Sequence, residues 1–111
     1  MGADAFYVYY GVKRSVEPDS PEMELLEREK HPIFDAAFDA KLHVAWGRMT
    51  EEEDYFLLIG HQIGCFGVEN ETYRQVPADE LRRIMQQTDQ RLRQAGIPET
   101  PALHCQLNAQ Y

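Results

Sequence analysis

The amino-acid sequence predicts an α+β fold of ferredoxin-like topology, a two-layer sandwich in which an antiparallel sheet carries helices on one face. Residues 5–12 and 55–61 are apolar at almost every position, which is typical of central strands that are covered on both faces. Residues 42–49 and 102–110 alternate between apolar and other side chains, a pattern that favours half-buried strands. With two helical regions between these strands, the order is β-α-β-β-(β)-α-β. In the split β-α-β arrangement that has this order, we expect the first and third strands to be central.

The first expected strand, AFYVYYGV, has two apolar faces. Its aromatic and β-branched residues favour a strand over a helix. One face carries Phe6, Val8, Tyr10 and Val12, and the other carries Ala5, Tyr7, Tyr9 and Gly11. The alternation does not decide which set the helices cover, so either set is a candidate for the open face of the sheet.

Start and stop signals define the helical regions. Ser20 followed by Pro21 predicts an N-cap with proline at the first helical position, and Pro32 is expected to interrupt this first region. The second region runs from Pro77 to Ala95 and is expected to end at Gly96. Its apolar stripe at helical spacing comprises Leu81, Ile84, Met85, Thr88, Leu92 and Ala95.

The segment LLIGHQIGCFGVEN, residues 57–70, places three glycines around one histidine and one cysteine. We interpret the glycines as a tight connection after the third strand, because glycine adopts the backbone conformations that a chain reversal requires. The segment from His61 to Val76 is then a hairpin-like excursion. Within it, residues 72–76 (TYRQV) are a candidate for a short edge strand.

Length and charge restrict the functional classes. The 111 residues fit one α+β domain over residues 1–111, and the net charge of −8 disfavours nucleic acid as a partner. No apolar run has the length of a membrane helix, and no export signal is found, so we expect a cytoplasmic protein without membrane contact. In that reducing compartment Cys65 and Cys105 are expected to be free, buried thiols. We expect no cofactor.

Metal binding has only weak support. His61 and Cys65 in the pattern H-x-x-x-C supply two ligands, whereas a metal site needs three or four. Either His104 or Cys105 could add a third ligand, but adjacent residues of a strand point to opposite faces. We therefore expect no metal site, with His61 and Cys65 as the candidates if one exists. A nucleophilic cysteine–histidine pair lacks an identifiable orienting group.

The sheet face away from the helices is the strongest candidate for a functional surface. Tyr7, Tyr9, His43 and His104 are expected on this face, where they would form an interface or a ligand surface. The alternative is that the excursion or the C-terminal tail covers it. Together with the acidic charge and the lack of a catalytic set, this face favours a non-enzymatic domain that binds a protein partner or forms a homodimer. An inhibitor or immunity-type protein for a basic enzyme would fit the same features.

Two other functions remain open. A small-molecule binding or enzymatic domain could form its pocket on the open sheet face, where tyrosine and histidine would orient and titrate a ligand. A metal-binding regulator would use His61 and Cys65.

Overall fold

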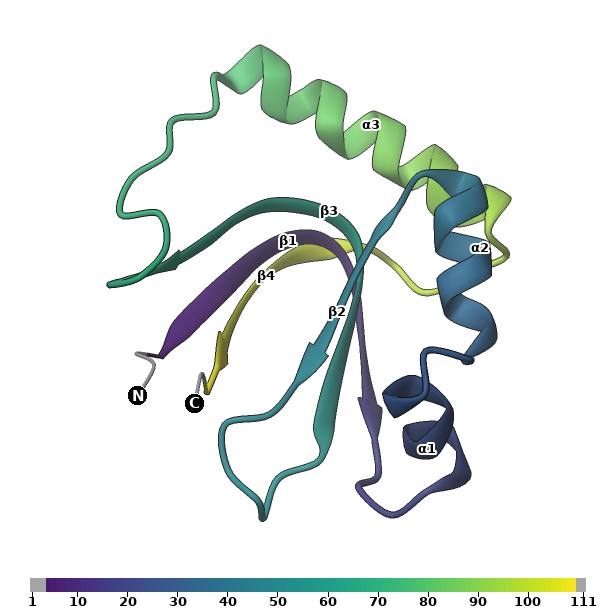
Figure 1. The fold of residues 1–111 in the computed structure, drawn as a ribbon. Coiled ribbons are helices and arrows are strands. Elements are labelled where there is room, and N and C mark those ends of the chain that lie inside the picture. The colour runs from purple at the N-terminus through teal and green to yellow at the C-terminus, as the bar shows by residue number, and fades with distance from the viewer. Residues whose placement is uncertain (1–3, 110–111) are drawn as a thin grey trace.

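The computed structural model describes residues 4–109 and shows an α+β fold with a four-stranded antiparallel sheet and three helices (Figure 1). The elements follow in the order β1 (Ala5–Val16), α1 (Pro21–Glu27), α2 (Pro32–Ala40), β2 (His43–Gly47), β3 (Tyr55–Gly67), α3 (Ala78–Gln94) and β4 (Ala102–Asn108). The strand order in the sheet is β2-β3-β1-β4, and every neighbouring pair is antiparallel. The prediction that the first and third strands are central is confirmed.

The interruption of the first helical region is also confirmed. Ser20 caps α1 by accepting a hydrogen bond from Met23 N at 3.2 Å. Pro32 then occupies the first turn of α2, and the Nδ1 atom of His31 caps this helix by accepting from Ile33 N at 3.0 Å. Each helix therefore begins at a proline whose missing N–H needs no partner there.

The predicted chain reversal at His61 is wrong, because β3 continues to Gly67. His61 pairs with Tyr10 of β1, and Gly67 pairs with Ala5. The glycines serve a different purpose: a methyl group on Gly11 would lie 2.7 Å from Gly60 Cα. This close backbone approach lies midway along two strands that curve strongly (Figure 1), a position where glycine removes the steric obstacle. A register shift between Val8 and Tyr9 inserts one extra residue in β3.

The predicted strand at residues 72–76 is also absent, since this stretch of the described chain is irregular. The preceding residue, Glu71, forms an isolated bridge with Phe66 instead. At this single parallel bridge the loop lies beside the end of β3 before it leads to α3. The last strand ends at Asn108, and Gln110, which the sequence included in it, lies outside the described residues.

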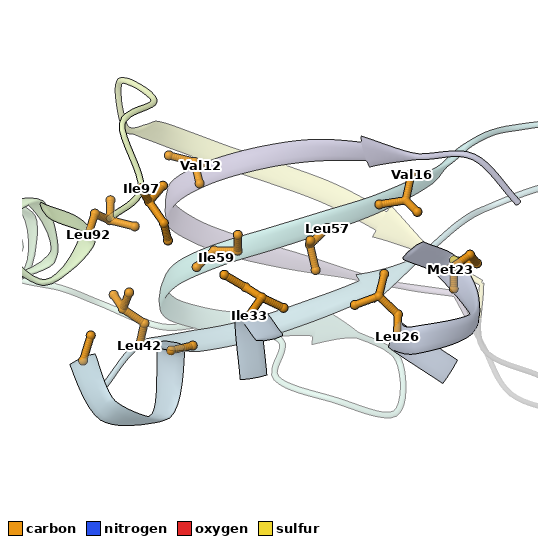
Figure 2. Close-up of a cluster of buried hydrophobic side chains, with 12 residues drawn as sticks. Val12, Val16, Met23, Leu26, Ile33, Leu42, Leu57, Ile59, Leu92 and Ile97 are labelled. Carbon is orange, nitrogen blue, oxygen red and sulfur yellow. The ribbon is translucent and has the colours of Figure 1, made fainter. Parts of the chain in front are cut away.

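The main core lies between the helices and the convex side of the curved sheet (Figure 2). It contains Val12, Val16, Met23, Leu26, Ile33, Ala37, Ala40, Leu42, Leu57, Ile59, Leu92 and Ile97. Residues of all three helices contribute, so the three helices share one face of the sheet. Burial of these apolar side chains is the main stabilising contribution to the fold.

The apolar stripe of α3 is buried only in part. Thr88 and Leu92 are buried, whereas Met85, nearer the start of the helix, is 37 % exposed. A straight helix packed on a curved sheet makes its close contact over a limited length, and Figure 1 shows α3 above the arch of β1 and β3. The sheet under the first half of α3 is therefore less well covered than helical periodicity predicts.

Candidate functional site

The four residues predicted for the open face all lie on the concave side of the sheet, opposite the helices. Tyr9 and Tyr7 alternate with the core-facing residues of β1, and register pairs His104 with Tyr9. The sequence had left the open set undecided, and the structure assigns Tyr7 and Tyr9 to it. His43 begins β2, where it pairs with Gly60.

This concave face is not the exposed aromatic surface that the sequence predicted. Tyr9 is only 1 % exposed, because it packs in a second cluster with Phe56 and Leu58. Tyr7 joins them with its ring edge-on to Tyr9, at a centroid distance of 6.1 Å. The two outer strands also approach each other across this face, since a side chain at Gly47 of β2 would overlap Asn108 Oδ1 of β4. Within residues 4–109, the side chains that pack on Tyr9 in this cluster come from the strands of the curved sheet itself.

A shallow hollow remains at one end of the concave face. Its volume is about 320 Å³, and it is lined by Tyr9, His43, Val44 and Gln62. The hydroxyl of Tyr9 donates to Gln62 Oε1 at 3.1 Å, and the backbone N–H of Gln62 donates to His43 Nδ1 at 2.8 Å. Burial raises the pKa of Tyr9 well above its usual value, so this phenol stays protonated as a donor. His104 is not part of the hollow, and its Nε2 lies 3.2 Å from Gly11 O.

The weak metal candidates do not converge. The His61 ring lies near that of His43, with centroids 5.2 Å apart and the ring planes tilted by 43°, whereas Cys65 lies further along β3, opposite Tyr7. Strand β1 separates both of them from His104 and Cys105 on β4. Among residues 4–109, no three histidine, cysteine or acidic side chains are grouped closely enough to hold a metal ion.

The electrostatic environment of these two residues follows from their positions. Burial lowers the pKa of His61, and the neighbouring His43 and Arg91 lower it further. Burial also raises the pKa of the Cys65 thiol, with a smaller contribution from Glu71. Neither shift favours a charged imidazole or a thiolate nucleophile at neutral pH.

Three exposed large apolar residues lie together on the convex side, on β4 and the adjacent end of β1. Leu103 and Leu107 are 58 % and 49 % exposed, and Phe6, which pairs with Leu107, is 39 % exposed. Cys105 lies between the two leucines on the same side and is also exposed. We name Phe6, Leu103, Cys105 and Leu107 the β4 surface. The sequence predicts a buried Cys105 thiol; this is wrong, because α3 packs mainly on β1 and β3 (Figure 1).

One signal in the sequence could have identified this surface. The segment from residue 100 to residue 111 contains no aspartate, glutamate, lysine or arginine, although 27 % of the chain is charged. Edge strands of proteins usually carry charged residues, because an uncharged edge is a template for pairing with another strand.

On the opposite side of the sheet, the part of β3 that extends beyond β2 is capped. Beyond Gly60, β2 no longer covers β3, and the exposed N–H of Gln62 is taken by the His43 side chain. Glu71 caps the next positions: its carboxylate accepts from Cys65 N at 3.3 Å, its N–H donates to Cys65 O at 3.1 Å, and its carbonyl accepts from Gly67 N at 3.0 Å. The Arg74 guanidinium holds the pKa of Glu71 below its usual value, so the cap stays charged. These contacts block strand addition along β3.

The outer edge of β4 is more accessible. Its pairing with β1 runs without a register shift from Ala102 to Asn108. On the outer side, the only hydrogen bond found among the described residues joins two adjacent residues of β4 itself: Gln106 Nε2 donates to Leu107 O at 3.0 Å. This regular, uncharged strand of seven residues thus presents the backbone groups of alternate residues at its outer edge.

No helix within residues 4–109 is long and apolar enough to cross a membrane. Comparisons of the chain with protein-family models, with curated proteins and with solved structures find no match. The fold and the surfaces described above therefore provide the basis for assigning a function.

Proposed function

We propose that this protein is a non-enzymatic interaction domain that self-associates through the β4 surface. The observation that carries the proposal is the grouping of exposed apolar side chains on one strand: Leu103 and Leu107 are each about half exposed, and Phe6 lies beside Leu107. Contiguous exposed apolar residues mark interfaces more often than isolated ones do. This location replaces the concave tyrosine face as the proposed interface.

Charge supports a second copy as the partner at this surface. With a net charge of −8, two copies repel each other at most relative orientations. The β4 segment contributes no formal charge, so an approach through this strand brings the fewest like charges together. An acidic protein that binds a basic partner would instead present its carboxylates at the interface.

Sedimentation velocity over a range of protein concentrations tests the proposal. The wild-type chain is expected to form a dimer, and Leu103→Glu is expected to sediment as a monomer because it places a charge inside the apolar contact. Phe38→Glu is the matched control, since Phe38 is 83 % exposed on α2 and lies outside the β4 surface. A wild-type monomer at every concentration, or equal weakening by both variants, would refute the proposal.

A second candidate function rests on the hollow beside Tyr9. Its hydrogen-bonded set of Tyr9, Gln62 and His43 presents a phenol, an amide and an imidazole to a small polar ligand. Backbone amide shifts measured during titration with small aromatic carboxylic acids test this function. Shifts centred on Gln62 and His43, lost in Tyr9→Phe, are expected of a site; shifts spread over the surface argue against it.

Two further proposals concern the fold and the location. We propose a ferredoxin-like split β-α-β relationship, supported by the central positions of β1 and β3 and by the helices between β1 and β2 and between β3 and β4. An experimental structure tests it.

We also propose a cytoplasmic location, supported by the free thiols Cys65 and Cys105. Fractionation of cells expressing the chain would test this location.

A further inference from the structure

We infer that two copies join through β4 edge to edge, antiparallel about a twofold axis at Cys105, so that the two sheets form one continuous sheet. This inference rests on the proposed self-association and adds the element, the direction and the register of the contact. It assigns to β4 an interface that repeats the hydrogen-bond pattern of the sheet itself.

The sequence of β4 is complementary to itself in this register. Cys105 is the middle residue of β4 (Ala102–Asn108), with three residues on each side, and Leu103 and Leu107 each lie two positions from it. Antiparallel pairing about Cys105 places Leu103 opposite Leu107 of the second copy, and this contact occurs twice by symmetry. On the concave side it places His104 opposite Gln106 of the second copy. Apolar side chains thus meet apolar ones, and polar side chains meet polar ones.

The backbone groups at the outer edge suit the same register. In an antiparallel ladder each residue directs its N–H and C=O to one side, and successive residues alternate. Because Leu107 O accepts a side-chain hydrogen bond from Gln106, we place the backbone groups of Leu107, Cys105 and Leu103 on the outer edge. Pairing about Cys105 brings these three residues opposite one another. Each pair can exchange two hydrogen bonds, roughly six in total, and the Gln106 side chain is released.

The other edges of the sheet do not offer an equivalent surface. The five-residue strand β2 is shorter than β4, and charged residues, Lys41 and Arg48, lie close to its two ends. The outer edge of β3 is capped by His43 and Glu71. Strand β4 has none of the usual protections, because it is regular and uncharged and has its proline, Pro101, before its first residue.

Site-specific cross-linking tests the register. In a Cys65→Ser background, the two Cys105 side chains are expected to lie opposite each other, with Cα atoms about 5.5 Å apart, within the range that a disulfide spans. Diamide oxidises the two thiols to a disulfide and is itself reduced to the hydrazine, taking up both protons and both electrons. We expect a covalent dimer at protein concentrations where sedimentation shows association.

Matched single-cysteine variants separate this register from others. Leu103→Cys in a Cys65→Ser/Cys105→Ser background places its thiols about 14 Å apart along the strands, so about tenfold less cross-linked dimer is expected than from Cys105. Leu107→Cys in the same background should behave likewise. A mixture of these two variants is expected to cross-link, because residue 103 of one copy then faces residue 107 of the other.

The outcomes distinguish the inference from the proposed function. If the wild-type protein is monomeric by sedimentation, the proposed self-association fails and the β4 pairing fails with it. If the protein is dimeric but Cys105 does not cross-link, or if Leu103→Cys alone cross-links as well as Cys105 does, the register is overturned while self-association stands. The register is supported if the Cys105 protein and the mixture of the two variants form cross-linked dimers efficiently, whereas neither Leu103→Cys nor Leu107→Cys does so by itself.

Discussion

The hydroxyl of Tyr10 on β1 donates a 2.7 Å hydrogen bond to Asp89 Oδ1 on α3. The two residues are far apart in the sequence, and the bond lies where α3 is in close contact with the sheet. Next to Asp89, Thr88 is buried, and Leu92 lies in the main core one turn further on. This hydrogen bond therefore helps to attach a helix whose first half is less well packed.

We expect removal of the Tyr10–Asp89 hydrogen bond to lower the free energy of unfolding by an amount that depends on pH. Tyr10→Phe is expected to lower the free energy of unfolding by about 1–2 kcal/mol at neutral pH, since the acceptor is charged. Burial, together with the bond to Asp89, raises the pKa of Tyr10 from 10 to about 12 in the folded protein. The contribution is thus complete below pH 10 and is lost as the pH rises to about 12.

Urea unfolding of wild type and Tyr10→Phe at a series of alkaline pH values measures this effect. The difference in stability between them should shrink from pH 10 upward. Tyr73→Phe is the control, because Tyr73 is 74 % exposed and bonds only to nearby Gln75. A constant difference between wild type and Tyr10→Phe would contradict the prediction.

The contact between Gly11 and Gly60 predicts a large effect of a single methyl group. In Gly11→Ala the new methyl would overlap the backbone of Ile59 and Gly60, so the central strands must separate. We expect a loss of about 3 kcal/mol or more in the free energy of unfolding, measured by chemical denaturation. Gly96→Ala is the comparison: its methyl meets no atom within 4 Å, and only its φ of +75° opposes the change, at about 1 kcal/mol. Equal losses would show that the close approach is unimportant.

Leu58 belongs to the second cluster, with Tyr9 and Phe56, on the concave face. We therefore expect Leu58 to behave as a core residue although no helix covers it. Leu58 and Leu57 are both fully buried, on opposite faces of β3. Leu58→Ala and Leu57→Ala are each expected to lower the free energy of unfolding by about 2–5 kcal/mol. Leu25→Ala, at a residue that is 40 % exposed, should cost less than either. If Leu58→Ala resembled Leu25→Ala in thermal or urea unfolding, the concave face would be ordinary surface.

The proximity of His43 and His61 predicts that the pKa of His61 depends on His43. The pKa of His61 is lowered below its usual value of 6.5, first by burial and then by His43 and Arg91. A lowered pKa means that the folded state resists protonation, so this contribution to stability is present above pH 6.5 and is lost as the pH falls. In NMR titrations of the imidazole signals, His43→Gln should raise the pKa of His61. His104→Gln should leave it unchanged, and a shift of equal size in both variants would contradict the assignment.

Local sequence patterns predicted the elements well where the relevant forces act over a few residues. The cap at Ser20 and the break at Pro32 depend on neighbouring backbone groups. The two strands with apolar residues on both faces were predicted to be central, and both are, because only a strand with neighbours on each side can bury such a sequence.

The predictions failed where curvature decides the outcome. The glycines around His61 have the composition of a turn, but in the folded chain Gly60, together with Gly11, allows β1 and β3 to approach closely where the sheet curves. The same curl buries Tyr9 without a covering element. It also leaves Leu103 beyond the reach of the helices, although its alternation with polar neighbours is typical of a half-buried strand.

Apart from the strand expected at residues 72–76 and the turn expected at His61, the sequence by itself determined the kinds of elements and their order, which strands are central, and the uncharged character of the last strand. Only the tertiary structure decided how strongly the sheet curves, and with it which apolar side chains are buried and which remain at the surface. The physical reason is that periodicity reports which residues share a face, whereas burial depends on what packs against that face from distant parts of the chain. Packing across the curl buries Tyr9 with Phe56 and Leu58 in a second cluster, whereas the β4 surface stays exposed.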